Sequence, residues 1–89
     1  MKHITKNNGA VEPFNPKKLN NSIKRALISN HVSNETALRV ADTVTAKVVD
    51  WLSNKTIVTY KDLRHQTTKF LAEYDKNSAM LYKKYKDLW

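Results

Sequence analysis

The sequence predicts an α+β domain in which a small three-stranded sheet packs on a four-helix bundle. Three observations favour this class: an Asn-Gly step between two short β-prone runs, a β-branched run at residues 56–58, and four segments with apolar residues at helical spacing. The 89 residues are enough for one domain, and no repeat, low-complexity tract or flexible linker divides them. We therefore expect one domain over residues 1–89.

The N-terminal strands are expected to form a β-hairpin. Residues 3–6 and 10–14 flank Asn7, Asn8 and Gly9, and an Asn-Gly step between such runs is a strong hairpin signal. Pro13 cannot donate a hydrogen bond to a ladder, so it marks an edge position or the end of the second strand. Residues 56–58 are expected to add a third strand to this hairpin.

Start signals and apolar spacing together place the four helices. The first follows Asn15, whose side chain can cap free N–H groups, and runs to about residue 30. The second starts at Ser33 and stops near residues 53–54. Thr59 and Asp62 have capping-box form and open the third, and the fourth follows a break around residues 75–77. The positions expected to face the core are Leu19, Ile23, Ala26, Leu27, Ala37, Ala41, Val44, Val48, Trp51, Leu52, Leu63, Thr67, Phe70, Leu71, Tyr74, Ala79, Tyr82, Tyr85, Leu88 and Trp89.

Several function classes are excluded by composition. The absence of cysteine removes disulfides, thiolate metal sites and thiol nucleophiles, and a single glycine removes the glycine-rich phosphate loops. No apolar run approaches the ~18 residues of a membrane span, and the start lacks a secretion signal, so a cytoplasmic location without membrane contact is expected. The histidines have no metal-ligand spacing and the carboxylates no acid–base pattern, so we predict neither a metal site nor an enzyme.

The positive charge is concentrated at the two ends of the chain. Of the formal net charge of +8, residues 1–25 contribute six cations against one Glu, and residues 76–89 four cations against one Asp, whereas residues 26–75 balance. If the termini meet, as they often do in small domains, this charge forms one anion-attracting face. The alternative is that these lysines are solvated charges scattered over helix surfaces.

The start of the first helix is a candidate anion site. Lys17 and Lys18 lie in its first turn, where the helix dipole disfavours cations by roughly 0.3–1 kcal/mol. A bound phosphate would offset this cost, because free N–H groups and nearby lysines bind anions without a glycine loop. Alternatively, the two lysines simply tolerate a small surface cost.

The segment ITKNNGAVEPFNPKKL, residues 4–19, resembles the opening of the ATP-cone domain. That family has a strand with Lys-Arg, an Asp-Gly turn, Glu-Pro-Phe-Asp and then Lys-Leu or Lys-Ile. The letters IVT at residues 57–59 resemble its third strand and cap, and residues 79–86 resemble its final helix. The resemblance thus covers nearly the whole chain. It departs at Asn7, where the family usually has Arg, and at Asn8 and Asn15, which replace Asp.

ATP-cones of ribonucleotide reductases and of their transcriptional repressor bind ATP or dATP and change the oligomeric state of the protein that carries them. The resemblance therefore implies a non-catalytic regulatory domain that binds ATP or dATP, with or without Mg²⁺. It also implies control of self-association or of contacts with a ribonucleotide reductase. Lys6, Lys18 and Lys86 would contact phosphates, Glu12 would position the nucleotide, and apolar side chains would line an adenine pocket. The implied binding residues are Ile4, Lys6, Asn7, Glu12, Phe14, Lys18, Leu19, Thr59 and Lys86.

A small basic nucleic-acid-binding module is the second interpretation. A sequence pI of about 9.8 and basic termini are its electrostatic footprint. No RNP-like, zinc-finger or helix-turn-helix signature supports it, although the two roles can coexist, as they do where an ATP-cone regulates a repressor. A helical interaction adaptor is a third class, but it needs an exposed apolar patch that the helical stripes do not reveal.

Overall fold

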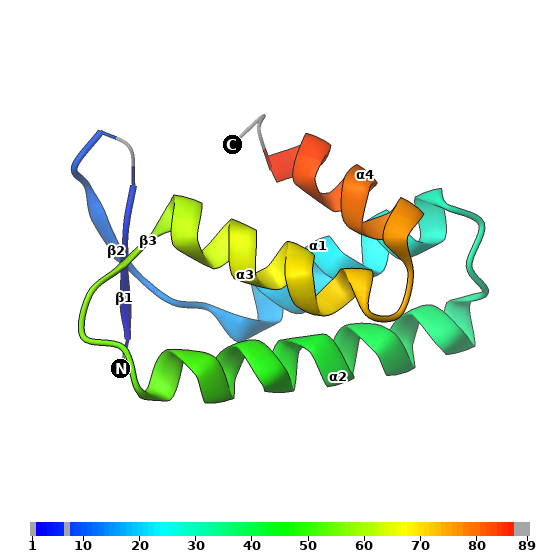
Figure 1. Cartoon of the computed structure of the whole chain (residues 1–89), viewed down its shortest axis with the longest axis horizontal. Helices are drawn as coiled ribbons and strands as arrows, with labels where there is room; N and C mark the ends of the chain where they lie inside the picture. Colours follow the sequence, from blue (N-terminus) through cyan, green and yellow to red (C-terminus); the bar gives the residue numbers. More distant parts are fainter. Residues whose placement is uncertain (1, 7, 87–89) are drawn as a thin grey trace.

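The computed structural model describes residues 2–6 and 8–86, with residues 85 and 86 described by their helical backbone only (Figure 1). The chain order is β1 (His3–Thr5), β2 (Val11–Pro13), α1 (Pro16–Ser29), α2 (Asn34–Ser53), β3 (Val58–Thr59), α3 (Tyr60–Ala72) and α4 (Lys76–Lys86). The predicted α+β class is confirmed. The expectations for Asn7, Leu88 and Trp89, and for the side chains of Tyr85 and Lys86, lie outside this description.

The sheet has the order β2-β1-β3. The predicted hairpin is confirmed: β1 pairs antiparallel with β2, with Ile4 opposite Glu12. Its turn uses Gly9 at a φ of 86°, a left-handed conformation that side chains disfavour. Pro13 ends the edge strand β2, where its missing N–H breaks no ladder bond.

The third strand differs from its predicted position. It comprises Val58–Thr59 rather than residues 56–58, and it pairs parallel with β1, so that Ile4 lies opposite Val58. Ile57 is 79% exposed. All the residues from 56 to 59 have a β-branched side chain, so only the pairing with β1 decides which of them form the strand.

The first three helices begin at the caps predicted for them. The Asn15 side chain accepts hydrogen bonds from the backbone of Lys17 and Lys18, and Ser33 accepts one from Thr36. At α3, Thr59 and Asp62 complete a reciprocal capping box. These caps fix where α1, α2 and α3 begin, and therefore fix which residues lie next to the sheet.

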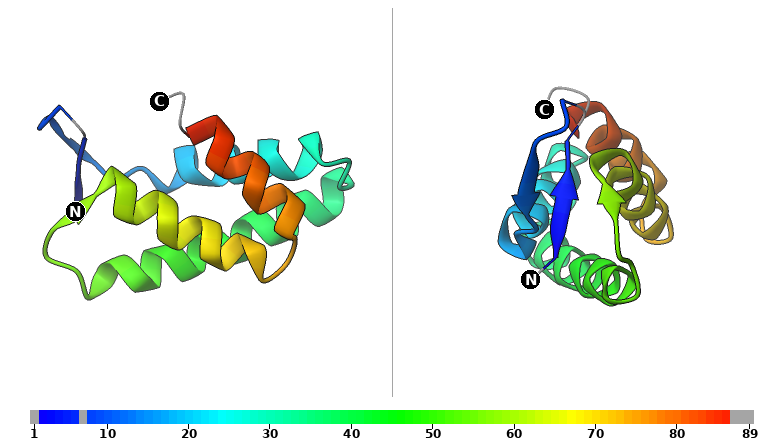
Figure 2. Two further views of the ribbon diagram at one scale, coloured as in Figure 1. Left: turned by 45° about the horizontal axis from the view of Figure 1, so that its top comes forward. Right: turned by 90° about the vertical axis from the view of Figure 1, so that its left-hand side faces the viewer.

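The sheet stands across one end of the helical bundle, and Figure 2 shows it from that end. Most predicted core positions are buried, whereas Trp51 and Phe70 are partly buried. Tyr74 is an exception, at 46% exposed, because α3 ends at Ala72 and the chain turns before α4. The break lies just before Lys76 rather than around residues 75–77.

α4 returns alongside α1 in the opposite direction. Near one end of the pair, the Asn30 side chain donates to both carboxylate oxygens of Asp75 at 3.2 Å. Near the other end, Leu19 of α1 and Tyr82 of α4 line the same hollow. None of the helices in the described ranges is long and apolar enough to cross a membrane.

Candidate functional site

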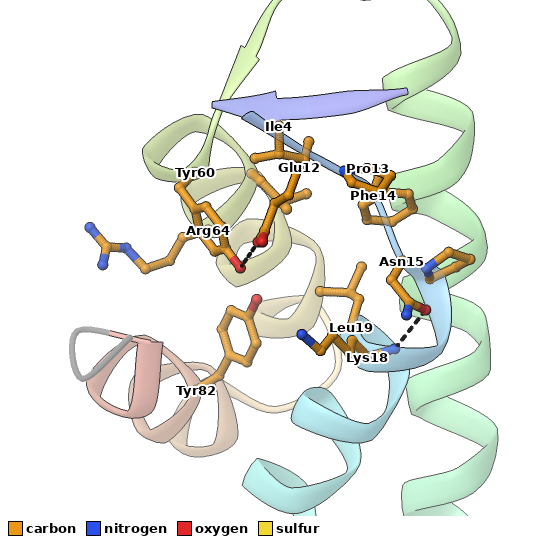
Figure 3. Close-up of a pocket in the computed structure, with 12 residues that line it drawn as sticks. Ile4, Glu12, Pro13, Phe14, Asn15, Lys18, Leu19, Tyr60, Arg64 and Tyr82 are labelled. Carbon is orange, nitrogen blue, oxygen red and sulfur yellow. Dashed lines mark hydrogen bonds between the residues drawn. The ribbon is translucent and has the colours of Figure 1, made fainter. Parts of the chain in front are cut away.

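A pocket of about 400 Å³ lies where the sheet meets α1, α3 and α4 (Figure 3). This volume falls within the range of small-molecule pockets, roughly 300–1,000 Å³. The lining residues come from β1, from β2 and its link to α1, and from three helices. They are Ile4, Glu12, Pro13, Phe14, Asn15, Pro16, Lys18, Leu19, Tyr60, Leu63, Arg64 and Tyr82.

The inner wall of this pocket is apolar and belongs to the core. Ile4 comes from the central strand, Leu19 from the apolar stripe of α1 and Leu63 from that of α3, and all three are buried. Phe14 packs partly buried against them, and the Tyr82 ring forms part of the wall on the α4 side. An apolar wall with a few polar groups suits a flat heteroaromatic ligand.

Glu12 brings a negative charge to the pocket, the one carboxylate among the described lining residues. Its Oε2 lies 3.3 Å from the Lys6 ammonium nitrogen, and its Oε1 accepts a hydrogen bond of 3.4 Å from the Tyr60 hydroxyl. Lys6 is therefore joined to the pocket through Glu12, without lining it. A carboxylate held from both sides has a fixed position and remains able to accept bonds from a ligand.

The two tyrosine hydroxyls of the pocket are neutral donors at neutral pH. Burial, and then the negative charge of Glu12 and its hydrogen bond, raise the pKa of Tyr60 to about 12. Burial also raises the pKa of Tyr82, against a smaller opposing effect of a hydrogen bond with Thr67. The pocket thus offers neutral hydroxyl groups beside one carboxylate.

Two cations line the pocket, one from each side. Lys18 belongs to the first turn of α1 and Arg64 to α3. In Figure 3 the Lys18 side chain faces the hollow, whereas the Arg64 guanidinium extends away from it on the far side. The Lys18 ammonium group at the edge of this apolar slot therefore attracts an anionic group attached to a flat ring.

The expectation of free N–H groups at the start of α1 is wrong. Pro16 has no N–H, and those of Lys17 and Lys18 donate to the Asn15 side chain at 3.0 and 3.3 Å. The next one, of Leu19, donates to the Asn15 carbonyl at 3.2 Å. Attraction for an anion at this helix start therefore comes from lysine side chains and the helix dipole.

The structure brings together five of the residues singled out from the sequence: Ile4, Glu12, Phe14, Lys18 and Leu19. Thr59 is not among the lining residues, because its hydroxyl accepts the Asp62 N–H in the capping box at 3.1 Å. Asn7 and the side chain of Lys86 fall outside the described part of the chain.

Sequence reasoning missed the contribution of α3. Tyr60, Leu63 and Arg64 lie in its first two turns, at the helical spacing that puts them on neighbouring rows. A usable signal was present: the Thr59 cap starts α3 directly after a strand that pairs with β1, so its first turns must lie beside the sheet. Among the described residues, no group of three or more His, Asp or Glu side chains could hold a metal ion.

The fold and the pocket together define a small α+β domain with a pocket, at the sheet end of its bundle, whose lining suits a flat, anionic ligand. A family model described as ATP cone domain matches residues 2–88, and the chain belongs to this family. ATP-cones are regulatory, non-catalytic domains that bind adenine nucleotides. Comparisons with curated proteins and with solved structures give no significant match.

Proposed function

We propose that the pocket takes the adenine of ATP or dATP and that Lys18 holds its phosphates at the rim. The supporting observation is the apolar slot itself, with Lys18 at its edge, formed largely by the segment that resembles the opening of an ATP-cone. The residues present fit such a ligand, because the aromatic and aliphatic wall matches a flat base and the rim is cationic. Mg²⁺ enters only as a counterion of the nucleotide.

Lys6 also takes part in phosphate binding, because its ammonium group contacts both the Glu12 carboxylate and the phosphates of the ligand. Its side chain is 43% exposed, and the Glu12 side chain is 37% exposed. Exposed pairs of this kind are worth about 0.2–1 kcal/mol, so loosening one costs little compared with a charge-assisted contact to phosphate. Glu12, released in part, then accepts a hydrogen bond from the ribose or the base.

Arg64 supplies a second lining cation from α3. The family usually has an arginine where this chain has Asn7, and a phosphate contact is expected to be missing there. A guanidinium forms paired hydrogen bonds with phosphate oxygens. Arg64 borders the pocket on the side opposite Lys18, and its guanidinium, which extends away from the hollow, compensates in charge for the change at position 7 when its side chain turns toward the bound phosphates.

The regulatory output proposed for residues 1–89 is a change in self-association or in contact with a ribonucleotide reductase or its transcriptional control, in the cytoplasm and without catalysis. Nucleotide occupancy changes the charge and the packing where the sheet, α1 and α4 meet. Coupling free energies between such sites are typically 1–3 kcal/mol. Sedimentation of the chain with and without nucleotide tests this output separately from binding.

Thermal unfolding with ATP, dATP, GTP and tripolyphosphate tests the binding proposal. A ligand at 100 times its dissociation constant stabilises the folded state by about 2.7 kcal/mol, which raises the midpoint of a chain of this size by about 10 °C or more. We expect ATP or dATP to give this increase and tripolyphosphate a much smaller one. Equal increases with all four polyanions would contradict a base-binding pocket.

A further inference from the structure

α1 and α4 together carry a charge equal to the whole net charge of the protein. Each contains four Lys or Arg residues and no Asp or Glu between its first and last residue, so the pair carries +8. The rest of the chain balances eight cations against eight acids. The cations of the pair are Lys17, Lys18, Lys24, Arg25, Lys76, Lys83, Lys84 and Lys86.

These two helices, far apart in sequence, lie side by side in the bundle (Figures 1 and 2). A hydrogen bond between the Asn30 and Asp75 side chains joins the two helices near one end of the pair. Leu19 and Tyr82 line the pocket near the other end. The cations of the two basic helices therefore lie along one packed pair of helices, and we name the surface that α1 and α4 present to solvent the α1–α4 face.

Among the described residues, no ion pair joins an acid to a cation of the α1–α4 face, and Asp42, which lies beside α1, accepts a hydrogen bond from the Asn20 side chain at 2.8 Å. The two ion pairs in the described part of the chain, Lys6–Glu12 and Lys47–Glu73, lie outside both helices. Asp75, directly before α4, is half-buried and accepts hydrogen bonds from the Asn30 side chain and the Ser78 N–H. Six cations of the face are exposed: Lys17, Lys18, Arg25, Lys76, Lys83 and Lys84.

We propose that the α1–α4 face binds the sugar–phosphate backbone of duplex DNA. Its cations are nearly all lysines, which act as point charges and contact phosphates without reading base sequence. They are spread over helices of 14 and 11 residues, roughly 21 and 16 Å long, a length over which a duplex presents many phosphates.

Among the described side chains of this surface, none offers the exposed aromatic ring that single strands require. Single-stranded nucleic acid is held by exposed aromatic rings on which bases stack. On α1 and α4, the aromatic side chain that the structure describes is Tyr82, which is 1% exposed and packs in the core. A duplex, whose bases are already stacked, does not need such rings.

Fluorescence anisotropy with a labelled duplex of about 20 base pairs, titrated with the full chain at several salt concentrations, tests this proposal. About five phosphate contacts give a slope of log K against log salt near −4.5, which is a roughly 500-fold loss of affinity between 50 and 200 mM salt. The double variant Lys17→Gln/Lys84→Gln removes two exposed cations of the face that do not line the pocket. It should reduce the steepness of the slope by about 1.8.

The matched control is Lys61→Gln/Lys69→Gln, which removes two exposed cations from α3. It should leave the slope unchanged. Equal effects of both double variants would overturn the proposal, because only the overall charge would then matter. Displacement of the duplex by polyglutamate at equal charge concentration would overturn the proposal and indicate an acidic protein partner instead. Tighter binding of single-stranded DNA than of the duplex would also overturn the proposal. ATP is absent throughout, so these outcomes do not depend on the nucleotide proposal.

Discussion

Replacing Lys18 with alanine tests the pocket with little risk to the fold. The Lys18 side chain is exposed and has no ion pair in the described structure, and its backbone N–H bond to Asn15 survives the change. Loss of a hydrogen bond to a charged group costs about 1.5–3 kcal/mol, so ATP affinity should fall by about 10- to 150-fold. Stability without ligand should change by no more than about 0.5 kcal/mol.

Thermal unfolding at a fixed ATP concentration measures this loss. If that concentration is 100 times the dissociation constant of the unmodified chain, the stabilisation is about 2.7 kcal/mol. After a 100-fold loss of affinity it falls to about 0.4 kcal/mol, and the increase in midpoint falls from 10 °C or more to about 2–3 °C.

Lys17→Ala is the control for Lys18→Ala. Lys17 is also exposed, lies in the same turn and donates to the same cap, but it does not line the pocket. It should keep most of the ATP-induced increase. The reasoning fails if Lys18→Ala retains the full increase, or if the two variants lose it equally.

Three further predictions follow from the described contacts. Because the pKa of Tyr60 is raised from 10 to about 12, its neutral form stabilises the fold fully below pH 10, and this stabilisation is lost as pH rises toward 12. Glu12→Gln should lower the pKa of Tyr60 but leave it above 10, since burial is the largest cause of the increase. Phenolate absorbance, compared with a Tyr60→Phe reference, measures this pKa. An unchanged pKa would contradict the contact between Tyr60 and Glu12. Asn15→Ala and Ser33→Ala should each cost about 1 kcal/mol in denaturant unfolding, but only Asn15→Ala should weaken ATP binding, because only Asn15 caps the turn that holds Lys18. ATP should weaken the binding of duplex DNA, and duplex DNA should weaken the binding of ATP by the same factor, because Lys18 belongs to both surfaces. Independent binding of the two ligands would show that the two sites are separate.

The helices could be predicted from sequence because their signals are local. Asn15, Ser33 and Thr59 satisfy the first N–H groups of their own helices, and apolar residues at helical spacing have one buried face. The hairpin follows from its Asn-Gly turn for the same reason. Such features depend on residues only a few positions apart.

Features that depend on contacts between residues far apart in the sequence were harder to predict. The strand Val58–Thr59 is fixed by its pairing with β1, more than fifty residues away, and not by its own β-branched composition. Arg64 borders the pocket because of that pairing, which sets α3 beside the sheet. Tyr74 has the spacing of a core residue but follows the end of α3, so helical periodicity no longer applies to it.

Residues of the candidate site could be predicted where both their type and their place in the sequence pattern indicate ligand binding. Glu12, Phe14 and Lys18 lie in the segment that resembles the ATP-cone opening, and the structure gathers them around one hollow. The pairing of Lys6 with Glu12 was not predictable, because it depends on which side chains face each other across the hairpin. Tyr82, expected only as a core residue, also lines the pocket.

Backbone and methyl NMR spectra of the isotope-labelled chain, titrated with ATP and separately with tripolyphosphate, test the central claim most directly. The account predicts that ATP shifts the resonances of Ile4, Leu19 and Leu63 most strongly, together with those of Glu12 and Tyr82, and that tripolyphosphate leaves the buried methyl groups nearly unchanged. Absence of these methyl shifts at saturating ATP, or the same shifts with tripolyphosphate, would contradict it.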